Sequence, residues 1–387
     1  MKILITTDMY FPVVTGVAQV IKLQADSLRR LGHDVRVMTI AKCRQSHFSD
    51  KDKVYYIKAA KFTFYKDSFM SFNLSDKMVP LIIAWKPDII HSQCEFFSLK
   101  FAKKISSETG APIVHTCHTD FPSYSDYFFK SYTLWKSIVP GMVKRALNTE
   151  SIQLIITPSL KTEKMLRSFA IERPITVLPS GINLHQFKVR ISEEEKNALL
   201  APFDVKTSDF IIVSVCRLTE EKKVRETIDN FAQLHIRDAR LLIIGDGDQR
   251  AALEAQVKRL DLQKSVKFFG MVPSSDVWKY YQLGDIFVSS SESETQGLTY
   301  YEACASGVPI VCKKDDCLKV MMEEGKNGYC FTTSEEFLKI VDMCYTNLEQ
   351  LNRMSAYAPV SVARFSGEAF AQNLLDIYQK YVGPEVK

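Results

Sequence analysis

The strongest constraint on the fold is an alternation of short apolar runs with longer amphipathic stretches. At the start of the chain, Lys2–Thr7 and Val35–Ile40 are apolar runs, and between them Val17–Leu31 has apolar residues at helical spacing. Strand, helix and strand in this order form a βαβ unit, whose two strands lie parallel in one sheet. The pattern therefore predicts an α/β protein with a parallel sheet.

The alternation continues in two series. Further strands are predicted in the first series at Val54–Ile57, Ile89–Ser92, Ile113–Thr116 and Leu154–Pro158, and in the second at Phe210–Val215, Leu241–Ile244, Val266–Phe269 and Ile286–Val288. Because 387 residues exceed one ordinary hydrophobic core, we expect two domains with a boundary near residue 185.

Composition argues against several classes of protein. Hydrophobic residues make up 46% and charged residues 25% of the chain, as in ordinary globular proteins. Nine scattered cysteines include no Cys-x-x-Cys pair, so we expect reduced thiols in a cytosolic protein, and neither a disulfide framework nor a zinc site. No apolar stretch reaches the roughly 18 residues of a membrane span.

Charge is unevenly divided along the chain. Residues 1–187 hold 25 Lys and Arg against 15 Asp and Glu, a net charge of +10, whereas the remainder holds 25 against 30, a net charge of −5. A basic first half favours an anionic partner such as a phospholipid surface, although a solvated surface with no partner gives the same counts. Nucleic acid is the weaker interpretation, because the sequence has no basic run or recognition motif for it.

The stretch Ser289–Pro309 carries Glu294 and Glu302 on either side of Gly297, after a predicted strand and before a helix. A glycine at such a crossing lets backbone N–H groups face an anion, which the helix N-terminus also attracts. Carboxylates beside an anion suit the hydroxyls of a sugar or ribose, so we predict a sugar-nucleotide site. Two structural alternatives remain: Glu302 forms a capping box with Thr299, and Glu294 is a solvated loop acid.

Two cations follow the first strand of the second series. Arg217 and Lys222 lie five positions apart on the loop after that strand. Cations at the carboxyl end of a strand can hold a diphosphate. The alternative is that both are surface cations paired with Glu220 or Glu221. The Glu294 loop leaves a strand at the same edge of the sheet, which favours the diphosphate interpretation.

Histidines mark the corresponding edge in the first series. His115 and His118 stand where the strand Ile113–Thr116 ends, and ligands bind at strand ends in open α/β sheets. His118 is predicted to line a cleft; alternatively both are ordinary histidines, one of them buried. No nearby residues have the spacing of metal ligands, so no metal site is expected. The first loop offers the single glycine Gly16, which disfavours a dinucleotide cofactor.

The segment Phe128–Leu147 differs in composition from the core elements. Its aromatic residues alternate with cations and are followed by apolar residues, which is typical of a segment on an anionic membrane surface. Pro140 and Gly141 are expected to divide it into two pieces. The alternative is a core helix with a basic outer face. The residues predicted to contact membrane or acceptor are Phe128, Phe129, Lys130, Tyr132, Trp135, Lys136, Lys144 and Arg145.

With two cations and two glutamates separated by seven residues, the chain resembles glycosyltransferase family 4. The resemblance runs nearly end to end. Its motifs are Thr7-Asp8-Met-Tyr10-Phe-Pro12, Gly16-Val17, Leu31-Gly-His33, His115-Thr-Cys-His118-Thr, Pro179-Ser-Gly-Ile-Asn183, Gly245-Asp-Gly247, Glu294-Thr-Gln-Gly-Leu-Thr-Tyr300 and Glu324-Gly-Lys-Asn-Gly328. The motif at Glu294–Tyr300 is similar to that of bacterial diacylglycerol glucosyltransferases.

The resemblance implies the GT-B fold, which is two Rossmann-like domains with a cleft between them. The implied parts are an acceptor- and membrane-binding domain at 1–184, a nucleotide-sugar-binding domain at 185–364, and a C-terminal helix at 365–387 that packs back on the first domain.

The resemblance also implies roles for individual residues. Glu302 would hold ribose hydroxyls, Glu294 would hold donor-sugar hydroxyls, and His118 would lie near the reacting carbon. Arg217 and Lys222 would neutralise charge on the departing UDP. The implied catalytic residues are His118, Arg217, Lys222 and Glu294, and the implied donor site comprises Gly16, Val17, Arg217, Lys222, Glu294, Gln296, Gly297, Leu298, Thr299 and Glu302.

The implied activity is a retaining, metal-independent transfer of glucose from UDP-glucose to the 3-hydroxyl of 1,2-diacylglycerol. We expect a cytoplasmic enzyme, peripheral on the inner face of the plasma membrane, whose partners are a UDP-sugar, a lipid acceptor and an anionic membrane, with no cofactor. Two alternatives remain. One is the same donor chemistry on another acceptor, such as a glycolipid, a teichoic-type polymer or a protein, and the other is a non-catalytic protein that binds a sugar nucleotide.

Overall fold

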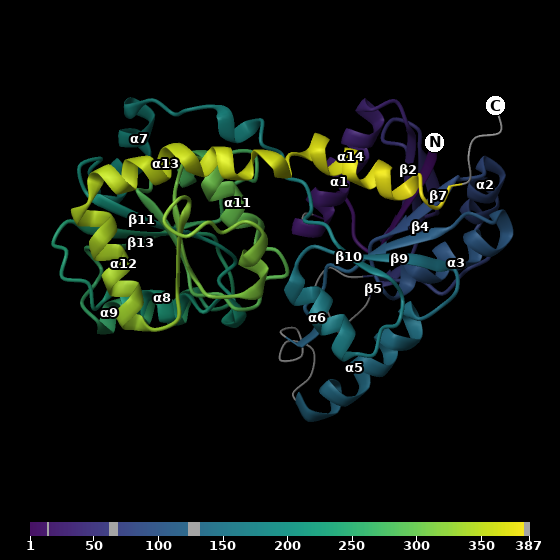
Figure 1. Cartoon of the computed structure of the whole chain (residues 1–387), viewed down its shortest axis with the longest axis horizontal. Helices are drawn as coiled ribbons and strands as arrows, with labels where there is room; N and C mark the ends of the chain where they lie inside the picture. Colours follow the sequence, from purple (N-terminus) through teal and green to yellow (C-terminus); the bar gives the residue numbers. More distant parts are fainter. Residues whose placement is uncertain (14, 62–68, 123–131, 383–387) are drawn as a thin grey trace. The chain divides into compact units, whose positions relative to one another are not determined.

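A computed structural model describes residues 1–13, 15–61, 69–122 and 132–382, and at 132–137 the backbone alone. It divides into two compact units (Figure 1). The first unit contains Met1–Gly181 and Gly367–Lys387, and the second contains Ile182–Ser366. The boundaries expected from the sequence, 184 and 364, lie within three residues of these divisions.

The first unit is built on a mainly parallel sheet with the strand order β10-β9-β8-β7-β1-β2-β4-β3. From β1 the chain adds β2, β4 and β3 on one side of the sheet, and it then adds β7, β8, β9 and β10 on the other side. The strand order therefore reverses between β1 and β7. The strands are β1 (Lys2–Thr7), β2 (Asp34–Ala41), β3 (His47–Ser49), β4 (Val54–Lys58), β7 (Ile89–Ser92), β8 (Ile113–Thr116), β9 (Ile152–Thr157) and β10 (Ile175–Val177), with β5 (Ala60–Lys61) and β6 (Phe69–Met70) in a separate ribbon.

Helices cover both faces of this sheet. The last helix of the chain, α14, lies beside α1 on one face (Figure 1), where Leu374 and Tyr378 are fully buried with Ile21 and Leu28. The other face is covered by a second apolar cluster that includes residues of α2, α3 and α5. The helices are α1 (Gly16–Arg30), α2 (Met78–Trp85), α3 (Phe97–Thr109), α5 (Tyr132–Leu147), α6 (Leu160–Ser168) and α14 (Gly367–Tyr378).

The helix α5 corrects one expectation. Pro140 and Gly141 do not divide the segment, because α5 runs without a break from Tyr132 to Leu147 with Pro140 inside it. A proline removes one backbone donor from a helix and strains the preceding turn. Here Val139, Val143 and Leu147, spaced four apart, are buried in the core, and this packing stabilises the helix before and after the proline.

The second unit contains a fully parallel six-stranded sheet with the order β13-β12-β11-β14-β15-β16. This is the order of a Rossmann fold, and it reverses between β11 and β14. The strands are β11 (Phe210–Val215), β12 (Ala239–Ile244), β13 (Val266–Gly270), β14 (Ile286–Ser289), β15 (Ile310–Lys313) and β16 (Gly328–Phe331). The last two were not among the strands predicted.

Two apolar clusters lie on the faces of this second sheet. Its helices are α7 (Glu193–Leu200), α8 (Val224–Phe231), α9 (Arg250–Arg259), α10 (Val277–Tyr281), α11 (Leu298–Ala305), α12 (Ser334–Thr346) and α13 (Leu348–Val362), with short 3-10 turns at η1 (Gln186–Lys188), η2 (Ala201–Phe203), η3 (Glu220–Lys222), η4 (Asp316–Val320) and η5 (Ala363–Phe365).

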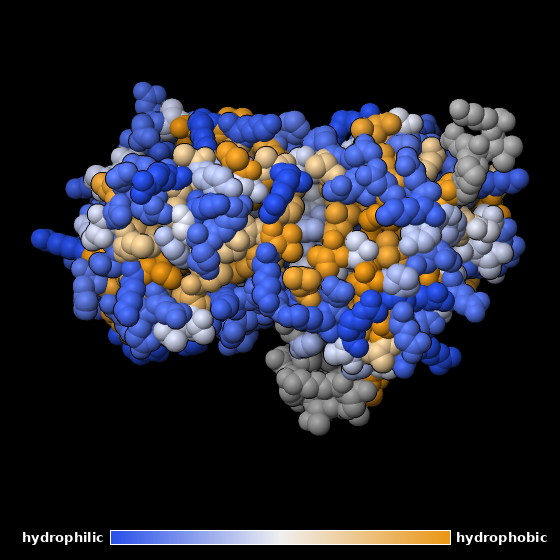
Figure 2. Space-filling view, viewed as in Figure 1, coloured by the Kyte–Doolittle hydropathy of each residue, from blue (hydrophilic) through white to orange (hydrophobic). Residues whose placement is uncertain are grey.

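The surface mixes hydrophilic and apolar residues within each unit (Figure 2). Single exposed apolar side chains such as Met271 and Leu348 are ordinary in folded domains. Within the part of the chain that is described, no helix combines the length and apolar composition needed to cross a bilayer.

Candidate active site

The candidate site in the second unit lies at the carboxyl edge of its sheet, where β11 and β14 are neighbours in register Ile212↔Ile286. The chain leaves both strands at this edge, one toward η3 and the other toward α11. Ligands of open α/β sheets bind at such a reversal of strand order. The predicted cations therefore follow β11 and Glu294 follows β14 at this edge, whereas Glu302 lies within α11.

The two loops touch through an ion pair. Lys222 Nζ lies 2.6 Å from Glu294 Oε1, and their side chains are 15% and 17% exposed. The Ser291 hydroxyl donates to the same carboxylate oxygen at 2.9 Å. Glu294 is thus fixed by two donors, and the alternative of a freely solvated loop acid is wrong.

Arg217 lies on the same loop but is more exposed. Its Nη2 is 3.8 Å from Glu221 Oε1, and the Thr219 hydroxyl donates to that oxygen at 2.7 Å. The sequence alternative of a surface cation paired with Glu221 therefore describes part of the environment of Arg217, whereas Lys222 reaches across to the other loop.

The second loop ends at Gly297, which caps the N-terminus of α11 with φ +74°. A Cβ placed there would lie 2.4 Å from the Tyr300 ring, so only glycine fits without a shift. The N–H groups in the first turn of a helix have no partners within the helix and favour an anion. Leu298 and Thr299 supply the first of these groups, and Gln296 is buried beside them.

Glu302 does not form the capping box that the sequence allowed with Thr299. The helix begins at Leu298, with Gly297 as its N-cap, so Tyr300 occupies the third helical position, where a capping-box acid would stand, and Glu302 lies two residues further along. Its carboxylate instead accepts a hydrogen bond of 2.7 Å from the Tyr281 hydroxyl. Burial raises the pKa of Glu302 to about 7, and the hydrogen bond from Tyr281 partly opposes this.

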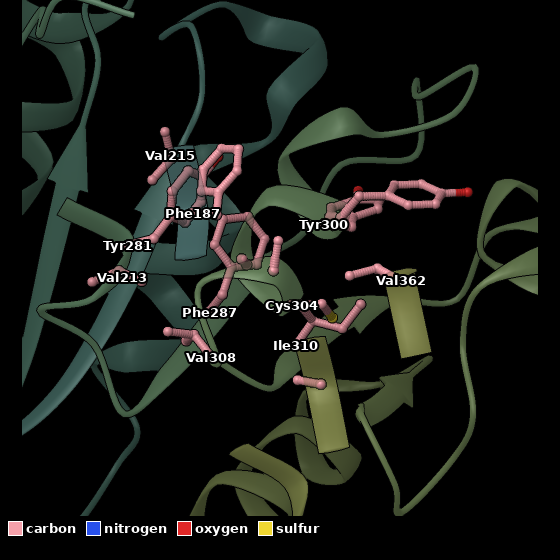
Figure 3. Close-up of a cluster of buried hydrophobic side chains, with 14 of the residues drawn as sticks. Phe187, Val213, Val215, Tyr281, Phe287, Tyr300, Cys304, Val308, Ile310 and Val362 are labelled. Carbon is pink, nitrogen blue, oxygen red and sulfur yellow. The ribbon is translucent and has the colours of Figure 1, made fainter. Parts of the chain in front are cut away.

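An apolar cluster supports this edge from behind. Tyr281, Phe287 and Tyr300 lie in succession across α10, β14 and α11, with ring centroids 5.9 and 6.0 Å apart, and Phe187 packs on Tyr281 (Figure 3). Close packing of these rings fixes the Tyr281 hydroxyl that holds Glu302. Tyr281 was not singled out from the sequence, because its contact with Glu302 joins two separate helices, and Ser291, although it lies within Ser289–Pro309, was given no role there.

The candidate residues of the first unit gather at the reversal between β1 and β7. His118 follows β8, and its Nε2 lies 2.7 Å from Gln93 Oε1, just after β7. Burial lowers the pKa of His118 to about 4, so its ring is neutral at pH 7. The neighbouring His115 is completely buried in β8, as one alternative expected, and lies 3.6 Å from Glu95.

Gly16 and Val17 begin α1 at the same edge of the first sheet. Thr15 caps the helix by accepting a hydrogen bond of 3.1 Å from the N–H of Ala18. Asp8, directly after β1, accepts hydrogen bonds from the N–H groups of Phe97 and Ser98, and so caps α3. The ends of β1, β7 and β8 thus carry polar side chains that fix one another.

The predicted membrane-contact residues are only partly described. Phe128, Phe129 and Lys130 lie outside the described residues, and Tyr132, Trp135 and Lys136 are described by backbone alone, within α5. Lys144 and Arg145 are exposed, and so are Ile138 and Met142 at 45% each. The outer face of α5 therefore combines cations with apolar side chains.

Among the described residues, no cluster of three or more His, Cys, Asp and Glu side chains could hold a metal ion.

Comparison with known proteins identifies the family. A model of Glycosyltransferase Family 4 matches residues 14–186, and one of Glycosyl transferases group 1 matches residues 195–360. The alpha-monoglucosyldiacylglycerol synthase of Streptococcus pneumoniae is 30% identical over 85% of this chain and 74% of its own length. The chain belongs to glycosyltransferase family 4.

A second relative, the alpha-monoglucosyldiacylglycerol synthase of Acholeplasma laidlawii, is 28% identical over 98% of this chain and 96% of its own length. Among solved structures, Anabaena HepE in complex with UDP superposes with a TM-score of 0.75 at 19% identity, over 98% of this chain and 100% of HepE. HepE has also been solved in complex with UDP-glucose. The GT-B fold expected for family 4, with two Rossmann-like domains, is confirmed.

Proposed function

We propose that this family 4 chain is a retaining glycosyltransferase that moves glucose from UDP-glucose to the 3-hydroxyl of 1,2-diacylglycerol at a membrane surface. The observation that carries the proposal is the contact between Lys222 and Glu294, at 2.6 Å, beside the N-terminus of α11. A cation and a carboxylate thus meet at one edge of the sheet, beside the backbone N–H donors of the first turn of α11. The names of the two synthases support the acceptor, and the UDP-glucose complex of HepE supports the donor.

The donor groups find matching partners in the second unit. Glu302, oriented by Tyr281, accepts hydrogen bonds from the ribose hydroxyls, and the first turn of α11 binds the diphosphate. Arg217 and Lys222 stabilise the charge that builds on the leaving diphosphate. Fixed cations and N–H groups are the main means by which an enzyme accelerates loss of such a group.

The reaction breaks the bond between glucose C1 and the diphosphate oxygen and forms a bond from C1 to the acceptor oxygen. The acceptor attacks the face that UDP leaves, so the configuration is retained, and its proton passes to the departing phosphate oxygen. Glu294, held by Lys222 and Ser291, receives sugar hydroxyls and does not act as a nucleophile. His118 acts as a neutral hydrogen-bonding group near C1, since its pKa is about 4.

The acceptor side belongs to the first unit. The outer face of α5 joins exposed Ile138 and Met142 to Lys144 and Arg145, which suits anionic lipid head groups above an apolar layer. This surface would bring a water-insoluble acceptor to a cytoplasmic enzyme at the inner face of the plasma membrane.

The decisive experiment measures released UDP from UDP-glucose, UDP-galactose and UDP-N-acetylglucosamine, with and without diacylglycerol in anionic vesicles. The expected result is release that requires UDP-glucose and diacylglycerol together, with an α-linked product by NMR, unaffected by EDTA. Release with another acceptor and none with diacylglycerol would favour the alternative of a different glycosyl acceptor. Binding of UDP without turnover of any pair would make the chain a sugar-nucleotide-binding protein.

A further inference from the structure

A connected set of buried polar side chains runs through the first unit and ends at His118. Gln24 of α1 lies in the middle of the set, where its Nε2 is 2.7 Å from His91 Nδ1 and 3.2 Å from the Tyr378 hydroxyl of α14. Tyr378 and His91 are themselves 2.5 Å apart. Gln93 links the set to His118, with a bond of 3.0 Å to Gln24 and one of 2.7 Å to the histidine.

These residues are shielded from water. Gln24, Gln93, His91 and Tyr378 are each at most 1% exposed, so each lost hydrogen bond leaves a buried polar group without compensation. A buried network of this kind favours one arrangement of its hydrogen bonds. Breaking a hydrogen bond there costs more free energy than at the surface, where water would replace the lost partner.

The order of donors and acceptors determines where His118 carries its proton. The Gln24 carbonyl oxygen accepts from the Gln93 amide nitrogen, which turns the Gln93 carbonyl oxygen toward His118. That oxygen can only accept, so His118 must donate through Nε2–H. A neutral imidazole has one N–H, and Nδ1 of His118 is therefore the acceptor nitrogen.

On the side away from Gln93, His91 and Tyr378 hold the Gln24 amide. The Gln24 amide nitrogen faces two atoms that can accept from it, His91 Nδ1 and the Tyr378 hydroxyl oxygen. His91 Nδ1 can do so when His91 carries its proton on Nε2, the nitrogen that lies 2.7 Å from the Thr116 hydroxyl. The Tyr378 hydroxyl lies 2.5 Å from the same nitrogen, whose single lone pair accepts from one of these two groups at a time. If the Gln24 amide rotated by half a turn, its oxygen would no longer accept the hydrogen bond from the Gln93 amide nitrogen.

We propose that Gln24 is a positioning residue which, held by His91 and Tyr378, orients the Gln93 amide and so keeps the proton of His118 on Nε2. The inference rests on the proposed function for its kinetic consequence, because it leaves His118 Nδ1 to accept a hydrogen bond from a hydroxyl of the donor or acceptor. A turned Gln93 amide would place the proton on Nδ1 and remove that acceptor.

The test uses the full chain labelled with [15N]histidine. Long-range 1H–15N spectra distinguish Nε2–H from Nδ1–H imidazoles, and His118→Asn assigns the His118 signal among the seven histidines. The expected wild-type result is the Nε2–H form of His118. Gln24→Leu removes the acceptor for Gln93 and should give a mixture of the two forms.

Gln24→Glu provides the rescue, since its carboxylate still accepts from the Gln93 amide and should restore the Nε2–H form. Gln256→Leu is the matched control, because Gln256 is an equally buried glutamine of the second unit. It should leave the His118 signal unchanged. If Gln24→Leu does not fold, Gln24→Met, which is of similar length but has no hydrogen-bonding amide, replaces it.

The kinetic readout follows from the same reasoning. Gln24→Leu should lower kcat by roughly 10-fold with KM for UDP-glucose unchanged, since a misplaced catalytic group affects turnover more than donor binding, and Gln24→Glu should recover most of the loss. An unchanged His118 signal in both folded Gln24→Leu and Gln24→Met would overturn the inference. The spectra need no substrate, so absence of turnover in the wild type would contradict the proposed function alone.

Discussion

Lys222 and Glu294 lie 2.6 Å apart in a setting that is only about one-sixth exposed. Coulomb attraction is less screened there than at an open surface, so each charge depends on the other. A bound diphosphate would give Lys222 a second anionic partner, and Glu294 would then be shared with sugar hydroxyls. Without a ligand, the two charged groups proposed to bind the diphosphate and the sugar therefore pair with each other.

Replacing Lys222 with alanine should lower kcat by roughly 10²-fold or more, because the leaving diphosphate loses a fixed cation. Lys223→Ala is the matched control, since Lys223 is the next residue in the chain but pairs with Glu292 at the surface. Single-turnover UDP release would measure both variants. Equal losses in the two variants would contradict the role assigned to Lys222.

Glu302 gives stability a pH dependence. Because the folded-state pKa of Glu302, about 7, lies above the ordinary glutamate value of 4.5, its contribution to stability is fully present below about pH 4.5 and is lost as pH rises through 7. Glu302→Gln should remove this component, so its Tm should exceed that of the wild type increasingly from pH 5 to pH 8. Thermal unfolding without ligand across that range tests this, and a Tm difference that stays constant would count against it.

At the scale of residues, the sequence predicted the groups that carry charge and missed those that orient them. Arg217, Lys222, Glu294 and Glu302 stand out because cations and acids at strand ends have few structural roles. Tyr281, an ordinary aromatic by sequence, was missed because its contact with Glu302 exists only after α10 and α11 have packed. The capping-box alternative for Glu302 is wrong because the N-cap of α11 is Gly297, two residues before Thr299.

The start of α11 depends on one backbone conformation. Gly297→Ala places a Cβ at φ +74° and 2.4 Å from the Tyr300 ring, so it should lower the free energy of unfolding by about 1–3 kcal/mol and weaken UDP binding. Gly141→Ala in α5 meets nothing within 4 Å and should be neutral or stabilising by about 0.5–1 kcal/mol. Urea unfolding and titration with UDP compare the two, and tight UDP binding by Gly297→Ala would exclude this helix end as the diphosphate site.

The basic segment Phe128–Leu147 should be necessary for membrane contact. Replacing Lys130, Lys136, Lys144 and Arg145 with glutamine should abolish binding to anionic vesicles while UDP binding stays intact. The charge-matched control replaces Lys258, Arg259, Lys264 and Lys267, which lie in and after α9 of the second unit. Vesicle co-sedimentation distinguishes the two, and unchanged sedimentation of the α5 variant would remove the membrane from the proposal.

At the scale of elements, the central strands were the most predictable. Phe210–Val215, Ile89–Ser92 and Ile113–Thr116 have the predicted bounds because strands buried on both faces are continuous apolar runs. Two strands of the second sheet were missed: β15, although it is apolar and buried, and the edge strand β16, which begins with a glycine, a residue typical of loops. The continuity of α5 could not be foreseen either, since it depends on tertiary packing around Pro140.

The chain crosses between its two units twice, so residues far apart in sequence share one core. Leu374 of α14 is fully buried with Ile3 and Ile21 of the first unit. Leu374→Ala should destabilise this unit by about 2–5 kcal/mol, with faster hydrogen exchange in β1 and α1 and little change in β11 and β12. Leu351→Ala in α13 is the counterpart and should show the opposite pattern. Equal exchange changes in both units would mean that the two cores unfold together.

The return of α14 to the first unit also has a consequence for synthesis. A ribosome releases the chain from its N-terminus, and residues 182–366 form a continuous segment that holds every strand of the second sheet. The first sheet is released earlier, yet Ile3, Ile5 and Leu28 lack part of their apolar cover until Leu374 and Tyr378 emerge. The half that is translated first is therefore completed last, and until then part of its apolar face lacks the cover that α14 provides.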